Sequence, residues 1–184
     1  VTSRGFPPGS REILNKLQEK PSFLMVGTIE PRKGHEQILD AFELLWHSDV
    51  DVNLTIVGKP GWLIEQFVNR LRTHAQSNKN LFWINGASDE CLQQIYRVSD
   101  CLIGGSYGEG FGLPLREVAG DNAYYFKADN PEDLANDLRQ WLTLYKNHAH
   151  PSSKGLLCKP WVESAQWLAN ELLHKPEDDS YGSL

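Results

Sequence analysis

The sequence predicts an α/β fold in which a parallel, Rossmann-like sheet is flanked by helices. Three observations predict it: short apolar runs of strand length, longer segments with apolar residues at helical spacing, and short polar connections between the two. The length of 184 residues corresponds to one compact unit. Sheets of this class bind ligands beyond the carboxyl ends of their strands, so the loops after the apolar runs are the first places to search for a site.

Five apolar runs have the length and composition of strands, and the first four lead into a glycine. They cover residues 22–27, 52–57, 81–84, 101–103 and 123–126. Between the runs, apolar residues recur every three or four positions, which predicts helices over 35–46 and 63–71 and a third helix that begins at residue 89. Ser88 is expected to cap the third of these helices. The residues expected on its buried face are Leu92, Ile95 and Tyr96.

Two more helices are expected towards the end of the chain. Asn130 and Pro131 are typical of an N-cap and a first helical position, and apolar residues then recur at helical spacing up to Tyr145. Residues 161–174 show the same spacing. Four tryptophans on predicted helices are expected in the core: Trp46, Trp141, Trp161 and Trp167. Trp62 follows a glycine-rich turn and is expected near a ligand.

These elements define the expected domain organisation. A linker or the start of the domain is expected over residues 1–21, a single domain over 22–175 and a disordered tail over 176–184. The first residue is valine rather than methionine, so we expect a piece of a longer protein.

Composition narrows the possible functions. Lysine and arginine number 18 and aspartate and glutamate 24, which gives a net charge of −6 and argues against general affinity for nucleic acid. No apolar run approaches the roughly 18 residues of a transmembrane segment. The three cysteines are scattered, which argues against a disulfide framework or a C-x-x-C metal site and favours the reducing cytoplasm.

The first motif lies between the first strand and the first predicted helix. It reads Gly27-Thr28-Ile29-Glu30-Pro31-Arg32-Lys33-Gly34. Two cations at a helix N-terminus oppose the helix dipole, and they are favourable there when a bound anion such as phosphate neutralises them. The alternative is a solvated turn with two ordinary surface cations.

The second motif is the glycine-rich stretch after the fourth strand. It reads Gly108-Glu109-Gly110-Phe111-Gly112-Leu113-Pro114-Leu115. Glycines let the backbone approach a ligand, and backbone N–H groups in such a turn can bind an anion. The alternative is a flexible loop with a solvated glutamate.

Together with the stretch 85–90, these two motifs resemble the signature segments of family 4 glycosyltransferases. The resemblance runs from about Phe23 to the final helix, and its most specific part is the string Glu-Gly-Phe-Gly-Leu-Pro over 109–114. It implies the donor-binding half of a GT-B fold in a retaining enzyme that uses a GDP-, UDP- or ADP-sugar.

The resemblance also implies roles for individual residues. Lys33, with Arg32 beside it, resembles the lysine that contacts the donor diphosphate, and Thr28 stands after Gly27 where many members carry an arginine. Glu109 resembles the first glutamate of the Glu-x7-Glu motif, near the transferred sugar. The remaining implied contacts are the backbone around Gly110, Phe111, Gly112 and Leu113 for phosphate, and Gly86, Ala87 and Ser88 for the base.

Glu117 has two interpretations. It lies eight positions after Glu109, as the second motif glutamate that binds the ribose does. However, the segment 116–121 also resembles a part of the family found further downstream, after another helix and strand. In that case a stretch is missing near 115–116, and the apparent spacing arises from the join.

The resemblance implies a mechanism and partners as well. Cations and backbone amides would stabilise the departing diphosphate, and without an Asp-x-Asp motif no divalent metal is expected. An absent N-terminal domain would bind the acceptor, a glycan or lipid-linked saccharide, so this piece alone would bind donor without turnover. By analogy the product is a bacterial surface polysaccharide, with mannose as the sugar, made in the cytoplasm near the inner face of the membrane.

Two other functions remain open. A Rossmann oxidoreductase that binds NAD would carry G-x-G-x-x-G after the first strand, and the segment 27–30 lacks that pattern. A non-catalytic module could dock a partner through exposed tryptophans. Nucleotide binding would separate these functions.

Overall fold

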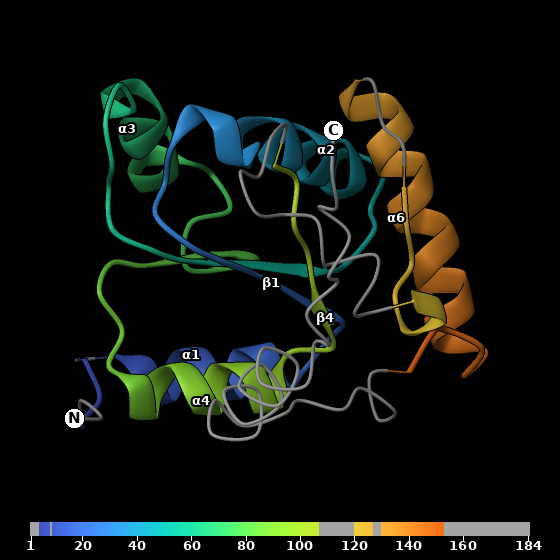
Figure 1. Cartoon of the computed structure of the whole chain (residues 1–184), viewed down its shortest axis with the longest axis horizontal. Helices are drawn as coiled ribbons and strands as arrows, with labels where there is room; N and C mark the ends of the chain where they lie inside the picture. Colours follow the sequence, from blue (N-terminus) through green and yellow to red (C-terminus); the bar gives the residue numbers. More distant parts are fainter. Residues whose placement is uncertain (1–3, 8, 107–119, 127–129, 153–184) are drawn as a thin grey trace, which may run out of the picture.

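The described part of the computed structural model comprises residues 4–7, 9–106, 120–126 and 130–152. These residues form one sheet of four strands in the order β3-β2-β1-β4, and all neighbouring strands are parallel. The predicted parallel α/β architecture is therefore confirmed (Figure 1). The strands are β1 (Ser22–Val26), β2 (Asn53–Val57), β3 (Leu81–Ile84) and β4 (Cys101–Leu102).

Helices cover both faces of the sheet. α2 (His35–His47) and α3 (Glu65–Thr73) lie on one face, with α6 (Pro131–Lys146) packed beside α2. α1 (Ser10–Leu17) and α4 (Asp89–Val98) pack side by side on the other face. Two short 3-10 turns, Pro31–Lys33 and Gly120–Asn122, complete the described elements.

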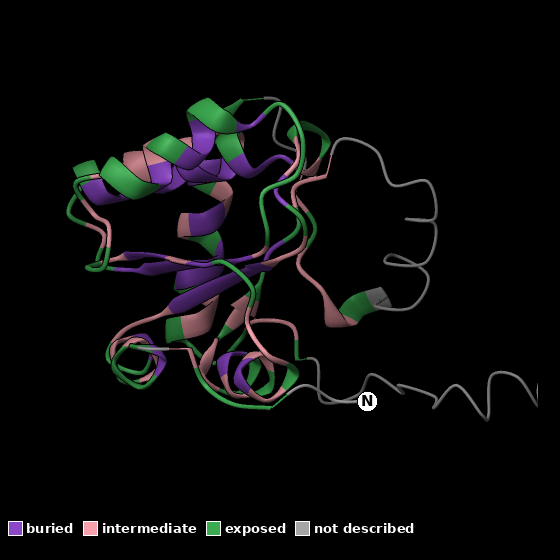
Figure 2. Cartoon of the chain, turned by 90° about the vertical axis from the view of Figure 1, so that its left-hand side faces the viewer, coloured by how far each residue is buried: buried purple, intermediate pink, exposed green. Residues whose placement is uncertain are grey.

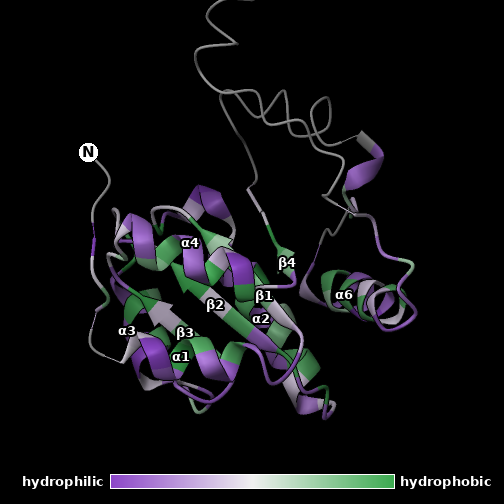
Figure 3. Cartoon of the chain, turned by 90° about the horizontal axis from the view of Figure 1, so that it is seen from below, coloured by the Kyte–Doolittle hydropathy of each residue, from purple (hydrophilic) through white to green (hydrophobic). Residues whose placement is uncertain are grey.

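The core is split by the sheet into two apolar layers. The larger layer lies under α2, α3 and α6, where Phe23 contacts Phe42 and Trp141 with ring centroids 5.3 and 4.9 Å apart. The smaller layer lies under α1 and α4 and includes Leu17, Leu24 and Phe82 among its buried residues. Strands covered on both faces are buried along nearly their whole length (Figure 2), as parallel strands require. Figure 3 shows the apolar strands behind α1 and α4.

The segment 1–21, expected to be a linker or the start of the domain, includes a helix. It contains α1, whose Leu17 is fully buried and whose Ile13 and Leu14 pack against the smaller core layer. The helix has only two turns, and its few apolar residues stand among charged ones, so the pattern was too short to be recognised. The structure therefore begins before residue 22.

Two further details of the prediction are wrong. Residues 123–126 do not form a strand: they pair with no other described strand, and Tyr124 and Phe126 instead pack against the larger core layer. Tyr96 is 45% exposed, because α4 rests on the sheet along the stripe of Cys91 and Ile95, four residues apart.

Other predictions are confirmed at their residues. Ser88 caps α4, and Asn130 caps α6 with Pro131 in its first turn. Trp46 and Trp141 lie in the core. The helix predicted over 161–174 and the tail over 176–184 lie outside the described residues, as does the point near 115–116 where a stretch is expected to be missing.

Candidate functional site

The strand order creates a switch point between β1 and β4. The chain builds β1, β2 and β3 in one direction across the sheet, and then returns to place β4 on the other side of β1. Loops that leave two such neighbouring strands diverge to opposite faces, and the crevice between them is where α/β sheets bind ligands. Here those loops are 27–34, which carries the first motif, and 103–106, which leads towards the second.

The two switch-point loops touch through their backbones. Gly34 has a φ of +70°, and a Cβ added to it would lie 2.1 Å from the carbonyl oxygen of Gly105. A Cβ on Gly105 would in turn lie 2.7 Å from Cδ1 of Ile38, on α2. Only glycine fits such a double approach. The loop 103–106 is therefore held against the N-terminal end of α2.

The two predicted cations lie in the turn Pro31–Lys33, directly before α2. Lys33 is half-buried there. Arg32 is half exposed, and its Nε donates a hydrogen bond of 2.8 Å to the Glu30 carboxylate. The sequence did not indicate this ion pair. It engages one of the five N–H donors of the guanidinium.

The first loop is fastened to the loop after β2. The N–H of Gly27 donates to the carbonyl of Val57 at 3.0 Å, and the N–H of Ile29 donates to the carbonyl of Lys59 at 2.9 Å. A Cβ on Gly58 would lie 1.9 Å from the carbonyl oxygen of Gly27. Thr28 is held between these bonds, so the turn that follows β1 has a fixed shape.

Lys59 is a third cation at this edge that the sequence analysis did not assign to the site. It is exposed, its side chain makes no hydrogen bond or ion pair with another described residue, and its Cε lies 3.6 Å from where a Cβ on Gly86 would be. Lys59 thus connects the loop after β2 with the loop after β3. A lysine between two glycines immediately after a strand was the available signal.

The loop Gly86–Ser88 follows β3 and begins α4. Gly86 adopts a φ of +84°. The Ser88 hydroxyl accepts a bond of 3.1 Å from the N–H of Cys91 and donates to the carbonyl of Gly5. Its oxygen is therefore already engaged as a helix cap. Ala87 packs against the smaller core layer, which leaves mainly backbone groups of this loop to meet a ligand.

His35, the first residue of α2, is a buried polar group that the sequence analysis passed over. It is 3% exposed, and neither ring nitrogen has a hydrogen-bond partner. Burial lowers the pKa of His35 to about 4, so the ring is neutral at pH 7. It lies under the turn that carries the two cations.

Trp62 lies on the same edge as the cations. It is 58% exposed in the turn after β2, and the adjacent Leu63 is 72% exposed with a φ of +52°. A bulky residue rarely adopts this left-handed conformation. The structure thus leaves two large apolar side chains in solvent beside the predicted site.

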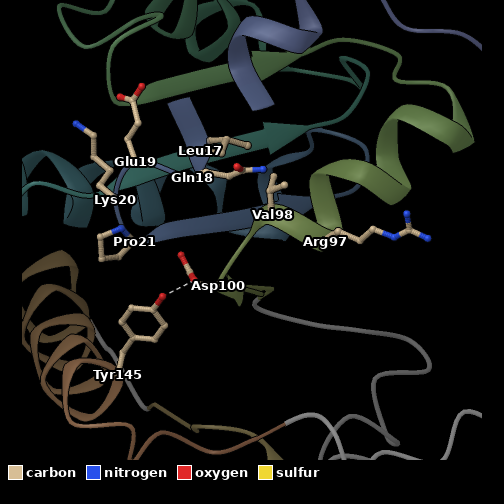
Figure 4. Close-up of a pocket in the computed structure, with 9 residues that line it drawn as sticks. All are labelled: Leu17, Gln18, Glu19, Lys20, Pro21, Arg97, Val98, Asp100 and Tyr145. Carbon is tan, nitrogen blue, oxygen red and sulfur yellow. Dashed lines mark hydrogen bonds between the residues drawn. The ribbon is translucent and has the colours of Figure 1, made fainter. Parts of the chain in front are cut away.

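A second hollow lies at the opposite, amino-terminal edge of the sheet (Figure 4). Tyr145, from α6, donates a hydrogen bond of 2.5 Å to Asp100, and the N–H of Ser22 donates to the same carboxylate at 2.8 Å. This hydrogen bond, with burial, raises the pKa of Tyr145 to about 12. Tyr145 and Asp100 are bonded to each other, and the hollow lies away from the carboxyl ends of the strands, so we do not assign it to the functional site.

The rest of the predicted site lies outside the described residues. This applies to Glu109, Gly110, Phe111, Gly112, Leu113 and Glu117. Among the residues that the structure describes, no group of three or more His, Cys, Asp or Glu side chains could hold a metal ion. Within the same residues no helix is long and apolar enough to cross a membrane.

Comparison with known proteins identifies the family. Residues 8–119 match the family model of group 1 glycosyl transferases. The chain belongs to this family. Over 190 aligned residues it is 43% identical to the serotype-specific mannosyltransferase WbdA of Escherichia coli, an alignment that covers 94% of this chain and 23% of that relative. The chain thus spans less than a quarter of the length of this curated relative.

Solved structures of the family share the fold. The C-terminal domain of the group 1 glycosyl transferase LpcC from Francisella tularensis aligns with a TM-score of 0.60 at 19% identity, covering 82% of this chain and 91% of that domain. HepE of Anabaena, in complex with UDP and glucose, aligns with a TM-score of 0.67 at 16% identity, covering 92% of this chain and 53% of HepE. This chain therefore has the architecture of one half of a GT-B glycosyltransferase.

Proposed function

We propose that this chain is the donor-binding domain of a retaining mannosyltransferase that uses a sugar nucleotide and helps to assemble a bacterial surface polysaccharide. The observation that carries the proposal is the pair of cations in the turn before α2, at the switch point of the sheet. The chain that contains them belongs to the group 1 glycosyl transferases. The 43% identity to a mannosyltransferase supports mannose as the transferred sugar.

The two cations stabilise the diphosphate as it leaves the transferred sugar. Lys33 and Arg32, with backbone amides at Gly112 and Leu113, bind its oxygens and stabilise the charge that develops as the glycosidic bond breaks. Loss of one such donor costs roughly 2.7–4 kcal/mol of barrier in enzymes that depend on one. The Glu30 carboxylate holds Arg32 in place at 2.8 Å and thereby lowers the entropy lost on binding.

The other assignments follow the order of the loops. Glu109 lies near the transferred sugar, Gly86–Ser88 hold the base, and Glu117 binds the ribose if no stretch is missing before it. The donor is a GDP-, UDP- or ADP-sugar. The acceptor, a glycan or lipid-linked saccharide, binds to another part of the full enzyme, which acts in the cytoplasm at the inner face of the membrane. This domain alone binds donor without transferring its sugar.

Thermal unfolding with added nucleotides tests the proposal. GDP or UDP is expected to raise the melting temperature, because ligands that bind only the folded state stabilise it. Lys33→Ala is expected to remove most of that shift, and Lys79→Ala, at an exposed lysine before β3, to leave it unchanged. NAD is expected to have no effect. A shift with NAD alone would favour the oxidoreductase, and no shift with any nucleotide would favour a non-catalytic module.

A further inference from the structure

A hollow of about 400 Å³ lies at the start of α4, between the loop after β3 and the segment that precedes α1. Its volume falls within the roughly 300–1,000 Å³ of small-molecule pockets. One wall is the loop Gly86–Ser88, and the other consists of residues 4–7 (Arg4, Gly5, Phe6 and Pro7). The second wall comes from a part of the sequence that no motif pointed to.

Hydrogen bonds at both ends hold this second wall in place. The N–H of Gly5 donates to the Glu90 carboxylate at 2.9 Å, and the carbonyl of Gly5 accepts from the Ser88 hydroxyl. Two residues further on, the carbonyl of Pro7 accepts from both the N–H and the hydroxyl of Ser10, at 3.1 and 2.8 Å. Phe6 lies between these anchors, so its backbone is held beside the loop.

The lining suits a flat, polar aromatic ring. Phe6 is 37% exposed, although a phenyl ring gains most from full burial. Arg4 lines the same hollow, and both aromatic and guanidinium planes stack on nucleobases. Across from them, Gly86 and Ala87 have side chains small enough to let a ring reach backbone donors and acceptors.

The position of the hollow fits the length of a nucleotide. The cations precede α2 at the end of β1, and the hollow lies at the end of β3, with β2 between the two strands. Neighbouring strands are about 4.8 Å apart, so these ends are about 10 Å apart. A nucleoside diphosphate laid along this edge spans such a distance and passes Lys59 on the way.

We propose that Phe6 stacks on the base of the nucleoside diphosphate that the loop Gly86–Ser88 holds. This inference rests on the proposed function. It makes the segment before α1 a determinant of affinity for the nucleoside, while the turn before α2 determines affinity for the phosphates. Phe6 is a binding residue and takes no part in the transfer itself.

Calorimetric titration of the 184-residue chain tests this division. The ligands are GDP, UDP, ADP and inorganic pyrophosphate, and the variants are Phe6→Ala, Phe6→Trp, Lys33→Ala and, as a control, Tyr96→Ala. Tyr96 is an aromatic residue of similar exposure, 45%, on α4 but outside the hollow. Phe6→Ala is expected to weaken the tightest nucleoside diphosphate about tenfold and to leave pyrophosphate unchanged. Phe6→Trp is expected to restore the affinity, and Lys33→Ala to weaken both ligands.

Each contrary outcome is distinguishable. If Phe6→Ala binds every nucleoside diphosphate like the wild type, or loses pyrophosphate equally, the base does not stack on Phe6. If Lys33→Ala still weakens binding in that case, the proposed function survives and only this inference fails. If the wild-type chain binds no nucleoside diphosphate, both fail.

Discussion

The two edges of the sheet differ in how their polar groups are satisfied. At the amino-terminal edge, Asp100 accepts bonds from the N–H of Ser22 and from Tyr145, while the Ser22 hydroxyl donates to Leu17. Asn53 adds a bond from its amide to the Ser22 oxygen. These bonds tie helix, strand and loop together there.

At the carboxyl-terminal edge several large side chains remain exposed. Lys59 has no described side-chain partner, and Trp62 and Leu63 are exposed. The backbone there is nevertheless fixed, because Gly34 and Gly58 bring neighbouring loops into direct contact. A rigid backbone with exposed side chains suits ligand binding, whereas the bonds at the amino-terminal edge serve stability. Substitutions at the two edges should therefore affect different measurements.

The largest expected effect is that of Gly34→Ala. The new Cβ would lie 2.1 Å from the Gly105 carbonyl oxygen, at a φ of +70°, so the two switch-point loops would have to separate. We expect loss of nucleotide binding and a fall in unfolding free energy of about 3 kcal/mol or more, from strain and overlap together. Denaturant unfolding and calorimetric titration measure the two effects.

Gly104→Ala is the matched control for that variant. A Cβ on Gly104 meets nothing within 4 Å, so its stability and binding should stay close to those of the wild type. If Gly34→Ala binds nucleotides as the wild type does, the close approach of the two loops is not needed for the site.

Asp100→Ala is expected to reduce stability without affecting binding. It leaves the N–H of the buried Ser22 without its side-chain acceptor and removes the partner of Tyr145. An unsatisfied buried donor costs about 1–3 kcal/mol. Urea unfolding should show this loss, while titration with GDP or UDP should give the wild-type affinity. A weakened affinity in a folded variant would argue against the separation of the two edges.

His35 should make stability depend on pH. Its pKa is about 4 in the folded state, below the roughly 6.5 of an unfolded histidine, so the unfolded chain binds more protons between these values. Its contribution to stability is complete above pH 6.5 and is lost as the pH falls towards 4. Between pH 7.5 and 5 we expect a loss on the order of 1–2 kcal/mol.

Comparison with two variants isolates this contribution. His35→Leu removes the group, so its unfolding free energy should fall less over that pH range than that of the wild type. His47→Gln, at an exposed histidine of the same helix, should keep the wild-type dependence. Equal pH dependence in His35→Leu and the wild type would show that His35 titrates normally.

Lys59→Gln is expected to have the smallest effect. An exposed lysine that meets one phosphate or ribose oxygen contributes modestly, so we expect nucleoside diphosphate affinity to fall roughly three- to tenfold with no change in stability. Titration at low and high salt measures it, because the contribution of a surface charge is screened by salt. Lys79→Gln, before β3 and therefore away from this edge, should bind as the wild type does.

Much of the fold could be predicted because its signals are local. The strand over Leu81–Ile84 and the caps Ser88 and Asn130 depend on neighbouring residues, and they occur where predicted. The strand expected over 123–126 does not form, since a strand exists only where another backbone pairs with it. Tyr96 was expected on the buried face but is exposed. The spacing of apolar residues indicates which side of a helix is buried, but not how wide the buried stripe is.

The candidate site was predictable in part. Lys33 and Arg32 were identified because cations before a helix are unusual, and the structure finds them beside the switch point. Lys59 and residues 4–7 were missed because each becomes relevant only through a loop distant in the sequence. The ion pair between Glu30 and Arg32 is local, yet the order of residues does not reveal the side-chain geometry that it needs.

The sequence by itself determined the alternation of strands and helices, the glycines and cations after the strands, and the family to which these motifs belong. Periodicity, caps and turns act over a few residues, so they can be read along the chain. Only the tertiary structure decided that β4 lies beside β1, that Gly34 meets Gly105, and that residues 4–7 face the loop after β3. Those contacts join segments up to 85 positions apart, as between Gly5 and Glu90, and they depend on the packing of the whole sheet and its helices.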